Sequence, residues 1–171
     1  MGKSLNYQFA FYEAQSFLIA AEAIGKEMQT VLLSENAIDK GIGLQFAKYI
    51  NHAFAFELLL KCIMIIEKGE YHSGHKLLSL FKQLSPQAQK EITLRFNQYN
   101  VTRRNSTYHG FFEKIELVTV LEEAGEAFVE FRYLFENKPT PKYDLDIALE
   151  CLEHYISTLK PDLKRLKLRR K

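Results

Sequence analysis

Apolar residues recur at steps of three and four along most of the chain, and this spacing predicts α-helices. Residues 6–33 carry a series of apolar residues at mostly three- and four-residue steps: Phe9, Tyr12, Phe17, Ala20, Ala21, Ile24, Met28 and Val31. Residues 44–68 form a second predicted helix, which is apolar on nearly every side from Ala53 to Ile66. A helix without a polar face belongs at the centre of a bundle, so we expect this second helix to lie in the core.

Short breaks with turn residues separate the predicted helices. The first break runs from Ser34 to Gly43. Farther along, Ser73 is placed to cap a short helix that carries Leu77, Leu78, Leu80, Phe81 and Leu84. Ser85 and Pro86 give the clearest start signal, because serine caps a helix and proline suits its first position. The helix that they open is expected to end near Asn100.

The second half of the chain continues the helical pattern. Residues 101–111 are polar and irregular, and helices are predicted over 112–136 and 143–159. No segment has the pattern of a β-hairpin or of a strand–helix–strand unit. The predicted fold class is all-α: an up-and-down bundle of four long helices plus one or two short helices. It forms a single domain over residues 1–160, followed by a C-terminal tail at 161–171.

Charge is distributed unevenly along the chain. The net charge is +2, but the last twelve residues, 160–171, contain seven Lys or Arg and a single acid, Asp162. The tail is therefore basic and the body mildly acidic. Two interpretations stay open: an electrostatic arm for nucleic acid, or a solvated helix end whose cations interact with the helix dipole.

Composition favours a water-soluble protein of the cytoplasm. Apolar residues make up 47% of the chain, as in globular domains. Cys62 and Cys151 lie far apart in helical patterns, so we expect buried free thiols in a reducing compartment. The N-terminus lacks a signal-peptide apolar region. The run Ala53–Ile66, interrupted by Glu57 and Lys61, is too short to span a bilayer, which needs about 20 apolar residues.

Known signatures of cofactor and metal sites are missing from the sequence. The glycine loops that bind phosphates, the HExxH motif and paired CxxC motifs do not occur. The five histidines are too scattered to define a metal site. We therefore expect no cofactor and no metal.

Candidate chemistry is concentrated between Arg103 and His109. These seven residues contain two guanidinium groups, one amide, three hydroxyls and one imidazole, with no purely apolar side chain. His109 can move a proton at neutral pH, because the pKa of free imidazole is about 6.5. Arg104 offers a fork of donors to a phosphate that gains negative charge. Asn105 can orient either group or bind the phosphate. The set suits phosphodiester cleavage; the alternative is an ordinary polar loop between helices.

The pattern Arg104-Asn105-x-x-x-His109 resembles the R-x(4–6)-H motif of the HEPN superfamily, a group of helical RNA-cleaving and nucleotide-binding domains. Other segments are similar to the same family in order and spacing. They are Phe-Glu-Leu-Leu-Leu-Lys at 56–61, the segment His75-Lys76-Leu77-x-x-Leu80, which is close to H-D-L-x-x-L, and Phe131-Arg132-Tyr133, which is close to an R-Y element. The resemblance covers roughly residues 45–160.

The resemblance implies a metal-independent endoribonuclease that works as a homodimer. In active members the histidine and the arginine promote attack of an RNA 2′-hydroxyl on the adjacent phosphorus, which leaves a cyclic phosphate. By this resemblance His109 is the acid/base, Arg104 stabilises the transition state and Asn105 supports both.

Substrate contacts and partners are also implied. Arg103, Arg132 and Tyr133 are the residues expected to bind substrate. The family setting implies a toxin or phage-defence role, with an antitoxin or a nucleotidyltransferase-like protein as partner and without a membrane.

Two other interpretations stay open. Arg132-Tyr133 is a rival counterpart of the motif arginine, and no histidine follows it at the required spacing. The chain would then be a non-catalytic HEPN-like module that binds RNA, a nucleotide or a protein partner. Alternatively, the near-heptad apolar stripe of residues 143–159 is an exposed docking face of a structural protein.

Overall fold

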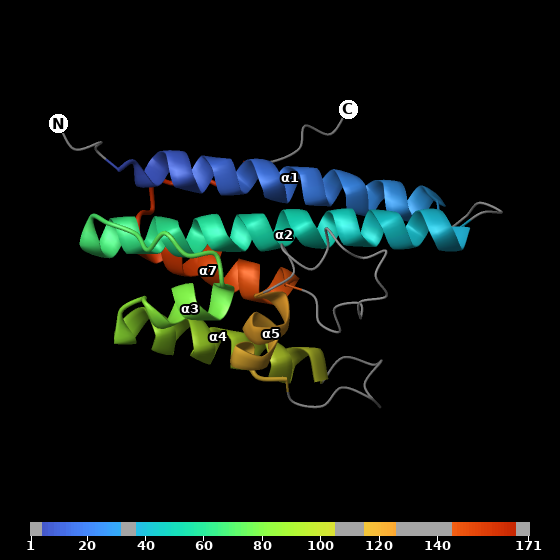
Figure 1. Cartoon of the computed structure of the whole chain (residues 1–171). Helices are drawn as coiled ribbons and strands as arrows, with labels where there is room; N and C mark the ends of the chain where they lie inside the picture. Colours follow the sequence, from blue (N-terminus) through green and yellow to red (C-terminus); the bar gives the residue numbers. More distant parts are fainter. Residues whose placement is uncertain (1–4, 32–36, 105–114, 126–144, 167–171) are drawn as a thin grey trace.

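The computed structural model describes residues 5–31, 37–104, 115–125 and 145–166 (Figure 1). Within these ranges the regular elements are α-helices and there is no strand, so the all-α prediction is confirmed. The six helices described are α1 (Tyr7–Val31), α2 (Ala37–Lys68), α3 (Leu77–Lys82), α4 (Pro86–Arg104), α5 (Leu117–Ala124) and α7 (Asp146–Leu159).

The two longest helices, α1 and α2, pack side by side along their length (Figure 1). The buried positions of α1 include Phe11, Ala14, Leu18 and Ala21, which follow three- and four-residue steps. Only Ala21 is among the positions from which the helix was predicted, and Phe9 and Tyr12 of that set are exposed, so the helix is confirmed but its buried face is shifted. α2 also contacts α3 and α7. Its largest buried side chains are at most 2% exposed: Phe56, Leu59, Leu60, Ile63 and Met64. Each such side chain stabilises the fold by about 1.5–3 kcal/mol relative to exposure, so this part of α2 is a main source of stability.

α7 packs against both α2 and α4, while α5 contacts α3 and α4. Figure 1 accordingly shows α1 and α2 on one side of the molecule and α3, α4 and α5 on the other, with α7 between them. The apolar stripe of α7 is buried inside the protein: Leu145, Ala148, Leu149, Leu152 and Ile156 are at most 3% exposed. The idea that this stripe is an exposed docking face is therefore wrong.

The predicted break from Ser34 to Gly43 is too long. α1 ends at Val31 and α2 already begins at Ala37, so Gly41 and Gly43 lie inside a helix. A glycine in a helix costs about 1 kcal/mol relative to alanine. Packing of α2 on α1 offsets that cost, because tertiary contacts outweigh local propensity over a long shared interface.

The two predicted serine caps have opposite outcomes. Ser73 does not cap the short helix: α3 begins at Leu77, and its cap residue, Lys76, makes no side-chain capping hydrogen bond. Ser85 does cap α4, because its Oγ accepts a hydrogen bond from the backbone N–H of Ala88 at 3.1 Å. Pro86 is the first residue of α4, as predicted.

The later helices differ from the prediction mainly in their ends. α4 continues to Arg104, beyond the predicted end near Asn100, so the first part of the expected polar segment 101–111 is helical. Of the helix predicted over 112–136, the structure describes α5; residues 126–136 lie outside the described part. α7 ends at Leu159, which is the predicted residue.

α2 meets the length and hydropathy of a membrane-spanning helix over Gly41–Lys68. The apolar stretch is thus longer than Ala53–Ile66. Of its most apolar window, 56% is buried inside the protein, as is common for the core helix of a water-soluble domain. This helix is weak evidence in either direction, and the cytoplasmic location stays a prediction.

The chain beyond α7 folds back onto the body. Leu163 is 6% exposed and belongs to the core. The backbone N–H of Leu166 donates a hydrogen bond to Gln15 Oε1 at 3.2 Å. The part of the basic tail up to Leu166 is therefore held against α1 and is not helical. Residues 167–171 lie outside the described part.

Candidate functional site

The predicted RNA-cleaving motif begins at the C-terminal end of α4. Arg103 and Arg104 are the last two residues of that helix. Asn105, His109, Arg132 and Tyr133 lie outside the described residues. The structure therefore gives the backbone position at which the motif starts, and the grouping of its side chains stays a prediction.

The Phe56–Lys61 segment of the family resemblance has one buried and one polar side. Phe56, Leu59 and Leu60 are fully buried in α2. On the polar side Lys61 Nζ lies 2.7 Å from Glu57 Oε1, and both side chains are only 12–14% exposed. The ring of Tyr71 lies 5.4 Å from Lys61 Nζ. Lys61 therefore links Glu57 on α2 to Tyr71 in the segment that follows α2.

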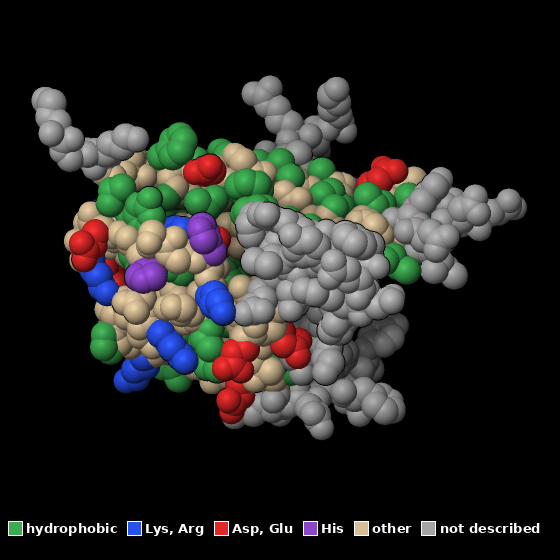
Figure 2. Space-filling model, in the orientation of Figure 1, with side chains coloured by type: hydrophobic (Ala, Val, Ile, Leu, Met, Phe, Trp, Pro, Cys, Tyr) green, Lys and Arg blue, Asp and Glu red, His purple; other side chains and the backbone are tan. Residues whose placement is uncertain are grey.

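The same carboxylate also holds a histidine of the second family-like segment. His75 Nδ1 lies 2.9 Å from Glu57 Oε1, and the His75 side chain is 69% exposed. Figure 2 shows histidine and lysine side chains on the face where the connection from α2 to α3 passes. A carboxylate that accepts from Nδ1 orients the imidazole and leaves Nε2 to exchange protons with solvent or a ligand. His75 is therefore held at the surface by a carboxylate of α2.

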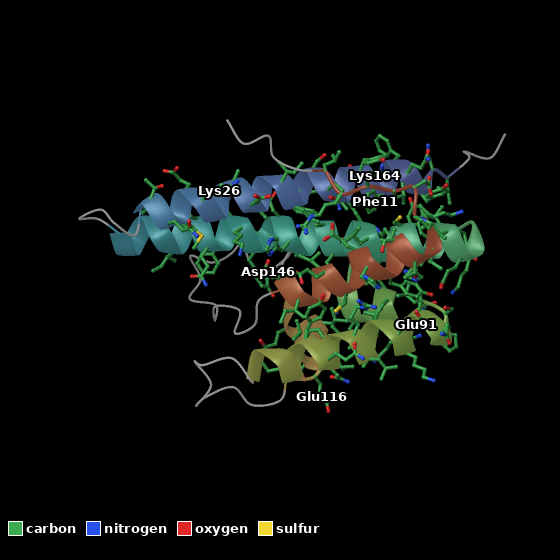
Figure 3. The ribbon with its side chains drawn as sticks, turned by 180° about the vertical axis from the view of Figure 1, so that it is seen from behind. Phe11, Lys26, Glu91, Glu116, Asp146 and Lys164 are labelled. Carbon is green, nitrogen blue, oxygen red and sulfur yellow. The ribbon has the colours of Figure 1, made fainter. Side chains whose placement is uncertain are left out.

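A second charged group joins α2 to the start of α7. Asp146 is the first residue of α7. Its two oxygens lie 3.2 Å from Lys48 Nζ and 3.2 Å from His52 Nδ1. His52 is 5% exposed, which makes it one of two buried polar residues among those described. The positive end of the helix dipole also favours an aspartate in the first turn of a helix. Figure 3 labels Asp146 at this end of α7.

This charged group lines a cavity of about 590 Å³ between α1, α2 and α7. Its apolar wall includes Leu18, Ala21, Met28 and Leu149. Its remaining charged lining residues are Glu22, Lys26, Glu150, Glu153 and Arg165. Cavities that bind small molecules have volumes of about 300–1,000 Å³ and combine apolar walls with a few polar groups. The described part of the chain therefore contains a cavity of ligand-binding size and composition.

A third histidine borders a smaller cavity between α4 and α7. This cavity has a volume of about 160 Å³, and Arg95, Gln98 and His154 are among its lining residues. Burial, and secondarily the charge of Arg95, lowers the pKa of His154 below its usual value. The imidazole is therefore kept neutral at neutral pH.

A hydrogen-bond network centred on Glu67 ties α2 to α4 and α7. Glu67 Oε1 accepts from Ser85 Oγ at 2.8 Å and from the Tyr155 hydroxyl at 3.0 Å. Burial, followed by the hydrogen bond and charge of Glu67, raises the pKa of Tyr155 to about 12. The network is structural in geometry: its members belong to three packed helices, and Tyr155 is only 6% exposed.

The two cysteines are buried free thiols, as predicted. Burial is the main cause that raises the pKa of both Cys62 and Cys151 to about 12. A thiol reacts as the thiolate, so neither is suited to nucleophilic chemistry. Among the described residues there is no group of three or more His, Cys, Asp or Glu side chains that could hold a metal ion.

Sequence reasoning missed the contacts of Lys48, His52 and Asp146. The sequence does contain one signal, because Lys48 and His52 are four residues apart and therefore lie on the same side of a helix. The partner, Asp146, is 94 positions after His52, and only tertiary packing brings the two together.

Comparisons of the chain with known protein families, with curated proteins and with solved structures found no match. The resemblance to HEPN domains stays a prediction from the residues.

Proposed function

We propose that the chain is a HEPN-like, metal-independent endoribonuclease in which Arg104, Asn105 and His109 act on one phosphodiester. The observation that carries the proposal is the position of Arg104 at the end of α4, with Asn105 and His109 following directly along the chain. A helix end fixes the backbone from which the motif starts, and a fixed backbone favours a defined geometry of catalytic groups.

The reaction needs only groups that this segment supplies. His109 would take the proton of the RNA 2′-hydroxyl as that oxygen attacks the neighbouring phosphorus. Arg104 would stabilise the negative charge that builds up on the phosphoryl oxygens. The P–O5′ bond then breaks, the leaving oxygen takes up a proton from water, and His109 returns its own proton to the solvent. The products are a 2′,3′-cyclic phosphate and a 5′-hydroxyl end. Arg103, Arg132 and Tyr133 are proposed to hold the RNA.

The proposal includes a complete fold and a homodimer in the cytoplasm. We infer that the whole chain is an up-and-down bundle of four long helices with short ones, supported by the lengths of α1, α2, α4 and α7: 25, 32, 19 and 14 residues. Support for a dimer comes from exposed apolar side chains at the N-terminal end of α1 and just before it, where Leu5, Phe9 and Tyr12 are 38, 68 and 39% exposed. Figure 2 shows hydrophobic side chains on this part of the surface.

Purified protein incubated with tRNA and mixed RNA in EDTA tests the activity. Cleavage that produces cyclic phosphate ends, and that is lost in both Arg104→Ala and His109→Ala, is the expected result. His72→Ala is the matched control, because His72 is an exposed histidine outside the motif and should retain full activity. Intact RNA, or cleavage that survives both motif substitutions, would overturn the proposal.

The dimer has its own test. Light scattering after gel filtration should give the mass of two chains for the unmodified protein and of one chain for Phe9→Ser. Leu94→Ser is the control, since Leu94 is 51% exposed on α4, away from this face. A monomeric unmodified protein would contradict the proposed dimer.

The second candidate function is a non-catalytic module that binds RNA, a nucleotide or a protein partner, including an antitoxin or a nucleotidyltransferase-like protein. The observation that favours it is the cavity of about 590 Å³ beside His52 and Asp146, which is built from described residues alone. If RNA stays intact but binds the protein, this function replaces the enzymatic one.

A further inference from the structure

We propose that the cavity between α1, α2 and α7 binds a flexible organic cation of the polyamine class. The proposal does not depend on RNA cleavage, because every residue that carries it lies outside the Arg104–His109 motif. In Figure 3 two of the lining residues, Lys26 on α1 and Asp146 at the start of α7, are labelled.

The charge balance of the cavity selects a cation over an anion. Most lining charges are already paired: Glu22 lies 3.0 Å from Lys26 Nζ, and Asp146 lies 3.2 Å from both Lys48 and His52. Glu150 lines the cavity, is exposed, and has no ion pair or hydrogen bond recorded among the described residues. An entering cation gains this carboxylate, whereas an anion must first compete for lysines that have partners.

Glu153 supplies a second carboxylate, whose position is fixed by a hydrogen bond from the buried side chain of Gln15. Gln15 is fully buried and its Nε2 donates to Glu153 Oε1 at 2.6 Å. The carbonyl oxygen of that amide is in turn held by the Leu166 N–H. A buried amide with both ends satisfied keeps the carboxylate in place before any ligand arrives, which lowers the entropic cost of binding.

The guanidinium group of Arg165 already forms a long ion pair with the Glu153 carboxylate. Arg165 Nη1 lies 3.6 Å from Glu153 Oε2, which is long for a charge-assisted hydrogen bond, and the Arg165 side chain is 56% exposed. An ion pair with a long separation and one largely exposed partner is weak. An amine of the ligand can therefore displace the Arg165 guanidinium from Glu153.

The shape of the site fits an elongated ligand with apolar links between its charges. A neighbouring cavity of about 300 Å³ shares Glu150, Glu153 and Arg165 with the first, and also contains Tyr99 and His154. The two cavities thus meet at the carboxylates and at Arg165. Leu18, Ala21, Met28 and Leu149 offer an apolar wall for methylene groups. Amines joined by short methylene chains satisfy both features, so spermidine is the probe.

Isothermal titration calorimetry with spermidine at low and moderate salt tests the proposal. Glu150→Gln and Glu153→Gln should each weaken binding by about threefold to tenfold, the fold-change of a lost, partly screened ion pair. Glu116→Gln is the control, because Glu116 is exposed at the start of α5 and does not line the cavity. Circular dichroism verifies that each variant is folded. The Glu150 side chain makes no ion pair or hydrogen bond with another described residue, so its variant remains informative if Glu153→Gln is unfolded.

Arg165→Ala decides the sign of the ligand charge. Removal of a competing cation should tighten spermidine binding by about threefold, whereas an anion site would be weakened by the same change. Inorganic phosphate serves as the anionic probe. Unchanged spermidine affinity in both glutamate variants would show only counterion binding and overturn the proposal. Weaker spermidine binding in Arg165→Ala, or phosphate binding that this variant abolishes, would also overturn it.

Discussion

Removal of the Ser85 hydroxyl is the most informative test of how this fold is stabilised. Ser85 Oγ makes two contacts: it accepts from the Ala88 N–H at 3.1 Å and donates to Glu67 Oε1 at 2.8 Å. The first contact caps α4, and the second ties the start of α4 to the end of α2. Ser85→Ala removes both without changing the backbone, because alanine fits the space of serine.

The two losses can be estimated separately. Loss of a serine N-cap typically costs about 1 kcal/mol. A hydrogen bond to a charged acceptor is worth about 1.5–3 kcal/mol. Glu67 retains its bonds to the Tyr155 hydroxyl and to the Ser85 backbone N–H, at 3.0 and 3.3 Å, so part of the second loss is compensated. We therefore expect the free energy of unfolding to fall by about 2–3 kcal/mol in total.

Urea unfolding followed by circular dichroism measures this change. For a domain of this size the expected loss corresponds to a fall in Tm of roughly 4–12 °C. Ser79→Ala is the matched control, because Ser79 is exposed on α3 and should change stability by less than about 0.5 kcal/mol. If Ser85→Ala is as stable as this control, the network on Glu67 does not stabilise the fold and the reasoning is refuted.

Three further predictions concern the core and its titratable groups. Because the pKa of Tyr155 is about 12 in the folded state and about 10 when unfolded, its contribution is present below pH 10 and lost between pH 10 and 12. Urea titrations should therefore show the unmodified protein losing about 2 kcal/mol more than Tyr155→Phe over that range; equal losses would contradict the shift. Leu60→Ala should destabilise by about 2–5 kcal/mol because Leu60 is fully buried. Leu94→Ala should leave the free energy of unfolding nearly unchanged, because Leu94 is 51% exposed. If the two variants lose similar stability, the assignment of Leu60 to the core is wrong. Cys62 and Cys151, with pKa values of about 12, should react with Ellman's reagent at pH 8 only in urea, and rapid reaction of the folded protein would show that they are accessible.

Most of the helices can be predicted from the sequence, because they depend on the spacing of apolar residues and on capping residues close to them in the chain. The apolar spacing in residues 6–33 predicted α1, although the buried face runs through Phe11, Ala14 and Leu18 and leaves the predicted position Phe9 exposed. Ser85 and Pro86 start α4 because the Ser85 hydroxyl caps the next turn and the fixed backbone angle of proline suits the first helical position. The Leu159 end of α7 was equally predictable, because Pro161 cannot continue a helix.

Predictions failed where a distant part of the chain decided the outcome. Gly41 and Gly43 suggested a break, but both lie inside α2, which packs along α1. His75 was noted in the sequence only as part of a family-like segment, and only the structure shows that Glu57, 18 positions earlier, holds it on the surface. Neither contact leaves a periodic signal, because periodicity records which face of an element is buried and not which partner covers it.

The sequence by itself determined the all-α class, most helix positions and the burial of both cysteines, since these depend on side-chain spacing and apolar character. It also supplied the Arg104–His109 motif, whose function stays a proposal. Only the tertiary structure brought Lys48 and His52 to Asp146, and Gln15 to Glu153, over separations of 98, 94 and 138 positions along the chain. The physical reason is that a cavity is bounded by helices that meet in space, and no single segment of the chain encodes its volume or its balance of charge.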